Sequence, residues 1–269
     1  MEVDHKYYHD APGTGEKKWK HYTIEFFMLF LAVSLGFFTE NFREHIVENE
    51  RAREMAVGLF DDLEKDSAQI NVVIKRNSLF ISELSSLIKT LSDPDVKNKV
   101  SLLTYYQASF LLEIDMPVPS KANLDQLKNS GSLRYLKNKK LVTDISQWDN
   151  MITVQFQERH QTDQQRLIEE IKAVSRIFYP VLLDSMRTIS FQYFYSGKNI
   201  NGEPIDQFEK IPESLITYDP VSLNEVIGWA SERKKNAYVR SVYFLPQQIE
   251  HIKTLMHELN NEFDIKKKK

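Results

Sequence analysis

The chain has 269 residues, with 35 Lys and Arg against 38 Asp and Glu, so its formal net charge is −3. A charge this close to zero gives no general attraction to nucleic acid, which needs a concentrated basic face. Cysteine is absent, which excludes disulfides, thiolate metal sites and catalytic thiols. Glycine and proline together are about half as frequent as in an average protein, which disfavours turn-rich β architectures. We therefore expect an all-α fold without a cofactor.

An apolar segment lies near the N-terminus. Residues 26–38 carry no charge and are rich in Phe and Leu. With the flanking aromatic residues, 19–42 would form a helix about 36 Å long, enough to cross a hydrocarbon core of about 30 Å. The sequence therefore predicts a transmembrane helix over 22–42, after a short tail over 1–21. The expected membrane-anchor flanks are Lys17, Lys18, Trp19, Lys20, Tyr22 and Phe42.

Two glutamates, Glu25 and Glu40, lie within this span. The Leu, Ile, Phe and Val residues between Tyr22 and Phe42 favour insertion by about 3 to 6 kcal/mol in total, whereas one central charge costs about 2.5 to 3.5 kcal/mol. The alternatives are a buried helix of a soluble core and a cleaved signal peptide. The first is disfavoured because the segment is apolar on every face, and the second because sixteen residues precede its basic patch.

The basic residues near the span indicate its orientation. Lys17, Lys18 and Lys20 crowd the N-terminal side, whereas the arginines on the other side, beginning with Arg43, are more widely spaced. Because cytoplasmic flanks carry the excess of Lys and Arg, we expect the N-terminus in the cytoplasm. The residues therefore predict a single-pass membrane protein whose C-terminal domain lies outside the cytoplasm.

Residues 43–269 are predicted to form a bundle of long helices that continues from the membrane helix, with coiled-coil-like packing. Apolar residues alternate spacings of four and three over 56–91, which indicates a heptad seam. The seam-packing residues are Phe60, Leu63, Ile70, Ile74, Ile81, Leu84 and Ile88. Asn77 also lies on the seam, where it either fixes the helix register or, more commonly, leaves a solvated polar gap.

Further helices are predicted over 96–116, 120–129, 138–178 and 222–263. Gly131 is placed for a left-handed C-cap, and Pro180 ends or kinks the third of these helices. Residues 222–225 have the form of a capping box, and Pro246 is expected to kink the last helix. Residues 195–220, rich in Gly and Pro, are predicted to be an irregular connection, and 266–269 a solubilising basic tail.

Candidate chemistry is sparse. The polar stretch 157–166 places His160 and Asp163 on the same face as core residues, which predicts either a buried polar or metal site or, more commonly, a stretch that projects into water. Adjacent acids such as Asp61–Asp62 and Glu169–Glu170 point apart on a helix, so solvated faces explain them better than acid–base catalysis. We therefore expect no enzyme and no metal site.

Three stretches carry a resemblance to a known group: residues 40–44 (ENFRE), 59–66 (LFDDLEKD) and 124–134 (LDQLKNSGSLR). Together with the span, they make the chain similar to a bacterial family of uncharacterised single-pass membrane proteins with a helical extracytoplasmic domain. The resemblance covers residues 26–263 in layout. It implies a protein of the bacterial inner membrane whose C-terminal domain lies in the periplasm, and it implies no activity.

These features predict a membrane-anchored, non-catalytic helical protein that acts as a scaffold or interaction module at the cell envelope. Its partners would be the lipid bilayer and either another protein or further copies of itself, through the long helices, but not nucleic acid. The alternative is a ligand-sensing bundle that signals through a partner protein. A hydrolase or metal enzyme would need a convergent pocket around His160, Asp163 or Trp148.

Overall fold

The computed structural model describes residues 14–196 and 205–265, and these residues form helices joined by short connections. They contain no β-strand, and their only bridge of that type is an isolated one between Ser101 and Pro212. The all-helical prediction is therefore confirmed, whereas coiled-coil packing stays a prediction. The chain divides into two units between Arg53 and Glu54.

The helices follow one another along the chain, two of them joined to their successors through π-helical segments and without a break. They are α1 (Thr14–Leu91), α2 (Val96–Lys99), α3 (Leu102–Ser109), η1 (Phe110–Leu112), α4 (Ala122–Asn129), η2 (Ser132–Tyr135), α5 (Lys139–Met151), η3 (Ile152–Glu158), α6 (Arg159–Ile177), α7 (Pro180–Ser196), η4 (Ile205–Lys210), α8 (Pro220–Val239), η5 (Arg240–Phe244) and α9 (Leu245–Phe263).

The first unit contains the apolar part of α1. Its large apolar side chains are exposed on every face, from Trp19 at 74% to Phe42 at 69% of their surface. Among the described residues, α1 is the one helix that is long and apolar enough to cross a membrane. The glutamates near its ends have partners within the helix, because Glu25 lies 3.2 Å from His21 and Glu40 lies 2.5 Å from Arg43.

Two hydroxyls inside the apolar segment are also satisfied locally. Thr23 donates to the main-chain oxygen of Trp19 at 2.9 Å, and Thr39 donates to that of Leu35 at 2.8 Å. Such bonds to the preceding turn remove the cost of placing a free hydroxyl in hydrocarbon. The side chains of Lys17 and Lys18, like the tail before residue 14, lie outside the described part of the chain.

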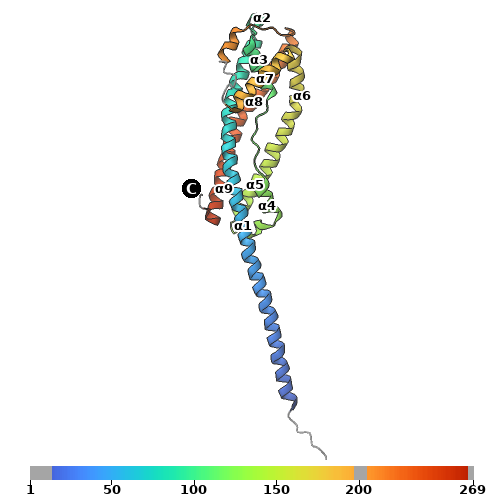
Figure 1. Cartoon of the computed structure of the whole chain (residues 1–269), viewed down its shortest axis with the longest axis vertical. Coiled ribbons are helices and arrows are strands. Elements are labelled where there is room, and N and C mark those ends of the chain that lie inside the picture. The colour runs from blue at the N-terminus through green and yellow to red at the C-terminus, as the bar shows by residue number, and fades with distance from the viewer. Residues whose placement is uncertain (1–13, 197–204, 266–269) are drawn as a thin grey trace, which may run out of the picture. The chain divides into compact units, whose positions relative to one another are not determined.

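The second unit is a bundle built around three long helical segments: α1 from residue 54 onward, α5–η3–α6, and α8–η5–α9 (Figure 1). It has two hydrophobic cores. One joins the end of α1, including Leu84 and Leu87, to α3, α6, α7 and α8. The other joins an earlier part of α1, including Leu63 and Ile70, to α4, α5, η3 and α9. α1 and the α5–α6 segment thus run in one direction and α8–α9 in the other.

The apolar stripe of α1 is wider than the predicted seam. Phe60, Leu63, Ile70 and Leu84 are buried, whereas the other seam residues Ile74, Ile81 and Ile88 are half-buried against the cores. Leu59, Val73, Phe80 and Leu87, one position before the expected seam, are at most 4% exposed. The face of α1 that packs in the bundle is therefore rotated toward these residues, as expected for a helix with neighbours on two sides.

The single helix predicted over 96–116 is wrong. α2 ends at Lys99 and α3 begins at Leu102, because the backbone between them pairs with a distant segment. The N–H of Leu102 donates to Ile211 at 2.9 Å, and the N–H of Glu213 donates to Val100 at 3.0 Å. Residues 113–121 then have no helical structure and return along the bundle to α4 (Figure 1).

The two long predicted helices are continuous, but each changes its backbone hydrogen-bonding register within its length. The segment 139–177 contains the π-helical η3, and the segment 220–263 contains the π-helical η5 just before Pro246. Because Pro246 has no N–H, the carbonyl of Val242 lacks its α-helical donor, which explains a change of hydrogen-bonding register at this point.

The predicted helix ends are mostly confirmed. α1 ends at Leu91, Gly131 has the left-handed φ of 72°, and Pro180 ends the helix before it by starting α7. The capping box at 222–225 is wrong, because the N-cap of α8 is Asp219, whose carboxylate accepts from the N–H of Ser222 at 2.9 Å. The tail 266–269 and residues 197–204 of the irregular connection lie outside the described residues, and 205–219 holds only the short η4.

Candidate functional site: a buried charged layer

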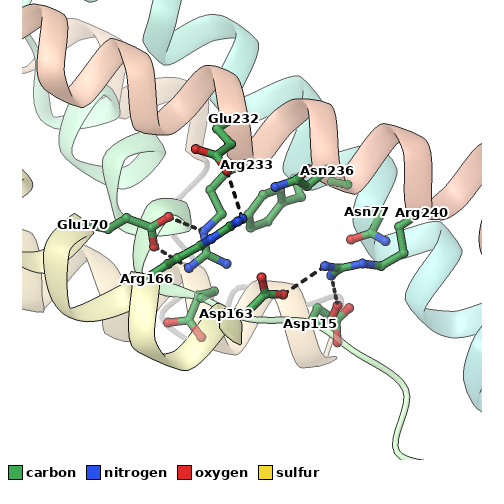
Figure 2. A pocket seen from close by; sticks show the side chains of 12 residues that line it. Asn77, Asp115, Asp163, Arg166, Glu170, Glu232, Arg233, Asn236 and Arg240 are labelled. Atoms are coloured by element: carbon green, nitrogen blue, oxygen red, sulfur yellow. Dashed lines mark hydrogen bonds and ion pairs between the residues drawn. The ribbon is translucent and has the colours of Figure 1, made fainter. Parts of the chain in front are cut away.

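A layer of charged side chains separates the two cores of the bundle. Asn77 lies between Val73 of one core and Phe80 of the other on α1, and Arg240 occupies the same level on η5 (Figure 2). We call this set the charged layer. It comprises Arg76, Asn77, Glu113, Asp115, Asp163, Arg166, Glu170, Arg187, Glu232, Arg233, Asn236 and Arg240.

Each carboxylate of the charged layer has its own arginine, drawn from a different segment of the chain. The pairs are Glu113 with Arg187 at 3.0 Å, Asp115 with Arg76 at 3.6 Å, Asp163 with Arg240 at 2.9 Å, Glu232 with Arg166 at 2.9 Å, and Glu170 with Arg233. The layer is therefore electrically neutral when every group is ionised. It requires no additional ion to balance its charge.

The pair between Glu170 and Arg233 is the most deeply buried. Nε and Nη2 of Arg233 donate to Oε1 and Oε2 of Glu170, respectively, and the bond from Nε to Oε1 measures 2.6 Å. The side chains are only 1% and 9% exposed. Burial raises the pKa of Glu170 above its ordinary value despite this partner, so desolvation of the carboxylate outweighs the attraction of Arg233.

Arg240 connects three segments at the centre of the layer (Figure 2). Its Nη2 donates to Asp163 of α6 at 2.9 Å, and its Nη1 donates to the main-chain oxygen of Asp115 at 3.3 Å. Burial lowers the pKa of Arg240 from its ordinary value. Because these bonds reach both α6 and the segment 113–121, Arg240 fixes the position of that segment in the bundle.

The layer encloses a cavity of about 20 Å³. This volume accommodates about one water molecule and no organic substrate. Asp115 lines the cavity, is 8% exposed, and has an Oδ2 with no hydrogen-bond partner among the described residues. Burial raises the pKa of Asp115 to about 6, so the reaction that the arrangement itself supports is proton uptake near neutral pH.

The two π-helical segments lie side by side next to the layer. The rings of Phe156 in η3 and Phe244 in η5 have centroids 5.6 Å apart, and the guanidinium of Arg159 lies 5.5 Å from the centroid of Phe244. Arg240 is the first residue of η5. Segments of π-helix are rare and are concentrated at functional sites. Because Arg240 belongs to both η5 and the charged layer, the change of helical hydrogen-bonding register in η5 lies at the level where the two cores meet.

Of the two predicted polar-site residues, the structure places only Asp163 in the layer. His160 is half-buried and does not line the cavity, and its Nε2 lies 3.0 Å from Nε2 of Gln164. Trp148 is fully buried in the core shared with α9. Of the three residues that would have to share a pocket in a hydrolase or metal enzyme, only Asp163 lines this cavity.

Several polar residues expected in water are buried instead. Asn77 is 2% exposed and donates to Oγ of Ser241 at 2.9 Å, so the solvated gap is wrong. Asp163 at 8% and Glu170 at 1% exposure also contradict the prediction of solvated positions. Most other residues of 157–166 are exposed, as predicted. The acids are buried because arginines on α8 and η5 neutralise them.

Sequence reasoning missed those arginines, although the pattern contains a signal for them. Arg233 and Arg240 are seven residues apart and continue the apolar stripe of Val226, Ala230 and Ala237. An arginine on the core side of a helix requires a buried acid opposite it. Glu170 of α6 is the buried acid opposite Arg233.

A second buried polar cluster holds α4 against α1. Asp62 accepts from Oγ of Ser120 at 3.0 Å and from Nδ2 of Asn123 at 2.8 Å, and Asp66 accepts from the N–H of Ser120 at 3.1 Å. Asp62 is therefore also buried, contrary to the prediction of a solvated face. Gly58 permits this close approach, because a Cβ there would lie 2.4 Å from Oδ1 of Asn123.

Among the described residues, no group of three or more histidine and acidic side chains is arranged to hold a metal ion. The chain matches no protein-family model, and comparisons with curated proteins and with solved structures found no similar protein.

Proposed function

We propose that this chain is a single-pass, membrane-anchored helical protein that acts as a non-catalytic scaffold or interaction module at the bacterial cell envelope. The observation that carries the proposal is the exposure of α1 between Trp19 and Phe42, where apolar side chains face outward in every direction. A water-soluble protein rarely exposes an apolar surface of this extent, whereas a lipid bilayer covers it.

The polar groups of this segment support a membrane location. Glu25 and Glu40 lie toward opposite ends and are each paired with a residue nearer the water, and the hydroxyls of Thr23 and Thr39 bond to the backbone. Their cost in a bilayer is therefore reduced. The lysines before the span support an orientation with the N-terminus in the cytoplasm and the bundle in the periplasm, anchored in the inner membrane.

The charged layer supports a structural rather than a catalytic role for the bundle. Its carboxylates are each bound by an arginine, and its cavity of about 20 Å³ excludes a substrate. The seam of α1 packs inside its own bundle, so a protein partner or a second copy would have to contact another surface.

Single-cysteine labelling tests the anchor and its orientation, because the chain has no native cysteine. Gln165 is exposed on α6, and Gly15 precedes the span. In cells whose outer membrane has been permeabilised, an impermeant maleimide should label Gln165→Cys but should label Gly15→Cys only after detergent lysis. Labelling of both variants in unlysed cells would contradict the proposed topology, and recovery of the full chain in the soluble fraction would contradict the anchor.

One observation favours the ligand-sensing alternative. An open groove of about 520 Å³ lies where α1 ends, and its lining includes Lys89, Asn98, Lys99, Thr104 and Glu209. Its size suits a small polar molecule. Thermal-shift measurements with a panel of small polar metabolites test this role, because a ligand that binds the folded state raises the melting temperature. A rise that is lost in Lys99→Ala would favour sensing, and no rise with any compound would leave the scaffold role.

A further inference from the structure

Arg76 of α1 joins three parts of the bundle at the edge of the charged layer. Its Nη1 lies 3.6 Å from Oδ1 of Asp115, in the segment 113–121. Its guanidinium carbon also lies 4.6 Å from the ring centroid of Tyr195 and 5.6 Å from that of Phe194, both in α7. The aromatic faces attract the cation and share it with the carboxylate.

Among the buried acids in the layer, Asp115 consequently has the weakest ion pair. The separation of 3.6 Å from its arginine exceeds those of Glu113 at 3.0 Å and Asp163 at 2.9 Å. Its Oδ2 has no partner among the described residues. A buried carboxylate with one weakly paired oxygen and one unpaired oxygen is costly to keep ionised.

The charged and titratable groups around Asp115 come from every element packed against it. They are Arg76 of α1, Glu113 of its own segment, Asp163 of α6, Arg187 and Tyr195 of α7, and Arg240 of η5. Arg187 and Arg240 are already bonded to Glu113 and Asp163. Neither is therefore free to replace Arg76 as the partner of the Asp115 side chain.

We propose that protonation of Asp115 favours the closed position of the segment 113–121, in which it packs within the bundle. We call this arrangement a proton-operated latch. A proton from solvent binds Oδ2 in mild acid, and the neutral acid then locks this segment between α1, α6 and η5. Asp115 lines a cavity together with Asn77, Glu113 and Asp163, whose side-chain oxygens can accept a hydrogen bond. When the proton leaves near neutral pH, the buried charge favours opening of the segment toward water. The latch adds a regulatory element to the bundle, whatever partner the bundle has.

The direction of the effect follows from linkage. Burial raises the pKa of Asp115 to about 6, whereas in an opened segment the pKa would return to about 3.9. The closed segment thus binds the proton more tightly than the open one, so acid favours closure. Between pH 7.5 and pH 5.0 the closing equilibrium should strengthen about tenfold.

Hydrogen–deuterium exchange of the detergent-solubilised full chain tests the latch. After correction for the intrinsic pH dependence of exchange, amides of residues 113–116 should be about tenfold better protected at pH 5.0 than at pH 7.5. Asp115→Asn carries no charge, so its protection should not change between the two pH values. Arg76→Gln should lose protection at pH 7.5 but not at pH 5.0, whereas a merely structural arginine would matter equally at both.

Asp66→Asn is the matched control, because Asp66 bonds to the N–H of Ser120 at the other end of the same segment, and burial raises its pKa to about 6 too. The response of residues 113–116 should persist in this variant. Equal protection of the unmodified chain at both pH values would overturn the proposal. So would a pH response that survives Asp115→Asn or disappears in Asp66→Asn.

Discussion

Glu170 of α6 and Arg233 of α8 form a forked ion pair in the interior of the bundle, with Nε of the arginine 2.6 Å from Oε1 of the glutamate. Neither side chain is more than 9% exposed. The pair joins two of the three long helical segments at the level where the two cores meet. Its energetic role can be separated from its structural role by substitution.

Arg233→Met leaves Glu170 buried without a counter-ion. We expect this change to lower the free energy of unfolding by about 3 to 5 kcal/mol, because an unpaired buried charge is strongly destabilising. The double variant Glu170→Leu with Arg233→Met should recover most of that loss, since hydrophobic packing can replace a buried pair. Denaturant unfolding of the detergent-solubilised chain, followed by circular dichroism, measures both. A loss below about 1 kcal/mol in Arg233→Met would show that the pair is hydrated.

Gly58 and Gly228 provide a matched pair of helix glycines. A Cβ at Gly58 would collide with Asn123 at 2.4 Å and displace it from Asp62, whereas a Cβ at Gly228 meets nothing within 4 Å. Alanine is favoured over glycine in a helix by about 1 kcal/mol. Gly228→Ala should therefore stabilise the chain by up to about 1 kcal/mol, and Gly58→Ala should destabilise it by about 1 kcal/mol because the bond to a carboxylate is lost. Equal stabilisation in thermal unfolding would contradict the close contact.

The buried carboxyl group of Asp66 should make the bundle more stable against unfolding in mild acid than at neutral pH. Burial raises its pKa to about 6, above the value of about 3.9 expected in the unfolded chain. The ionised form is thus penalised in the folded state, and the penalty, about 2 to 3 kcal/mol at pH 7, disappears as the pH falls from about 6 toward 4. Asp66→Asn keeps the Oδ1 acceptor for Ser120 and removes the charge.

The measurement is the difference in unfolding free energy between the unmodified chain and Asp66→Asn at pH 7 and at pH 5. Relative to the variant, the unmodified chain should gain stability at the lower pH. Buried acids outside this cluster contribute equally to both proteins and cancel in this difference, whereas the repulsion between Asp62 and Asp66 is part of the penalty that the variant removes. An unchanged difference would show that water reaches Asp66.

The apolar pattern was enough to predict most of the long helices, and local signals predicted several of their ends. The spacing of apolar residues predicted a helix over 56–91, and the special backbone preferences of Gly131 and Pro180 marked a cap and a helix end. These signals are local, because each depends on the residue and its near neighbours. The break at Val100 was not predictable in this way, because it depends on backbone bonds to residues 211–213.

The charged layer could not be predicted from the sequence for a similar reason. Asp163 and Glu170 have the same sequence pattern whether they face water or an arginine, and their partners lie 77 and 63 residues away. The predicted position of Asp163 on the core face was correct, but only the partner decides whether such an acid is buried. The two arginines on the apolar stripe of α8 and η5 were the available indication.

The account depends most on α1 as a membrane anchor, and alkaline carbonate extraction tests this most directly. Membranes containing the full chain should retain it in the pellet after the wash, whereas the chain lacking residues 1–42 should be recovered as a soluble, helical protein because both cores lie beyond residue 53. Release of the full chain by carbonate would contradict the membrane anchor and, with it, the proposed place of the bundle at the cell envelope.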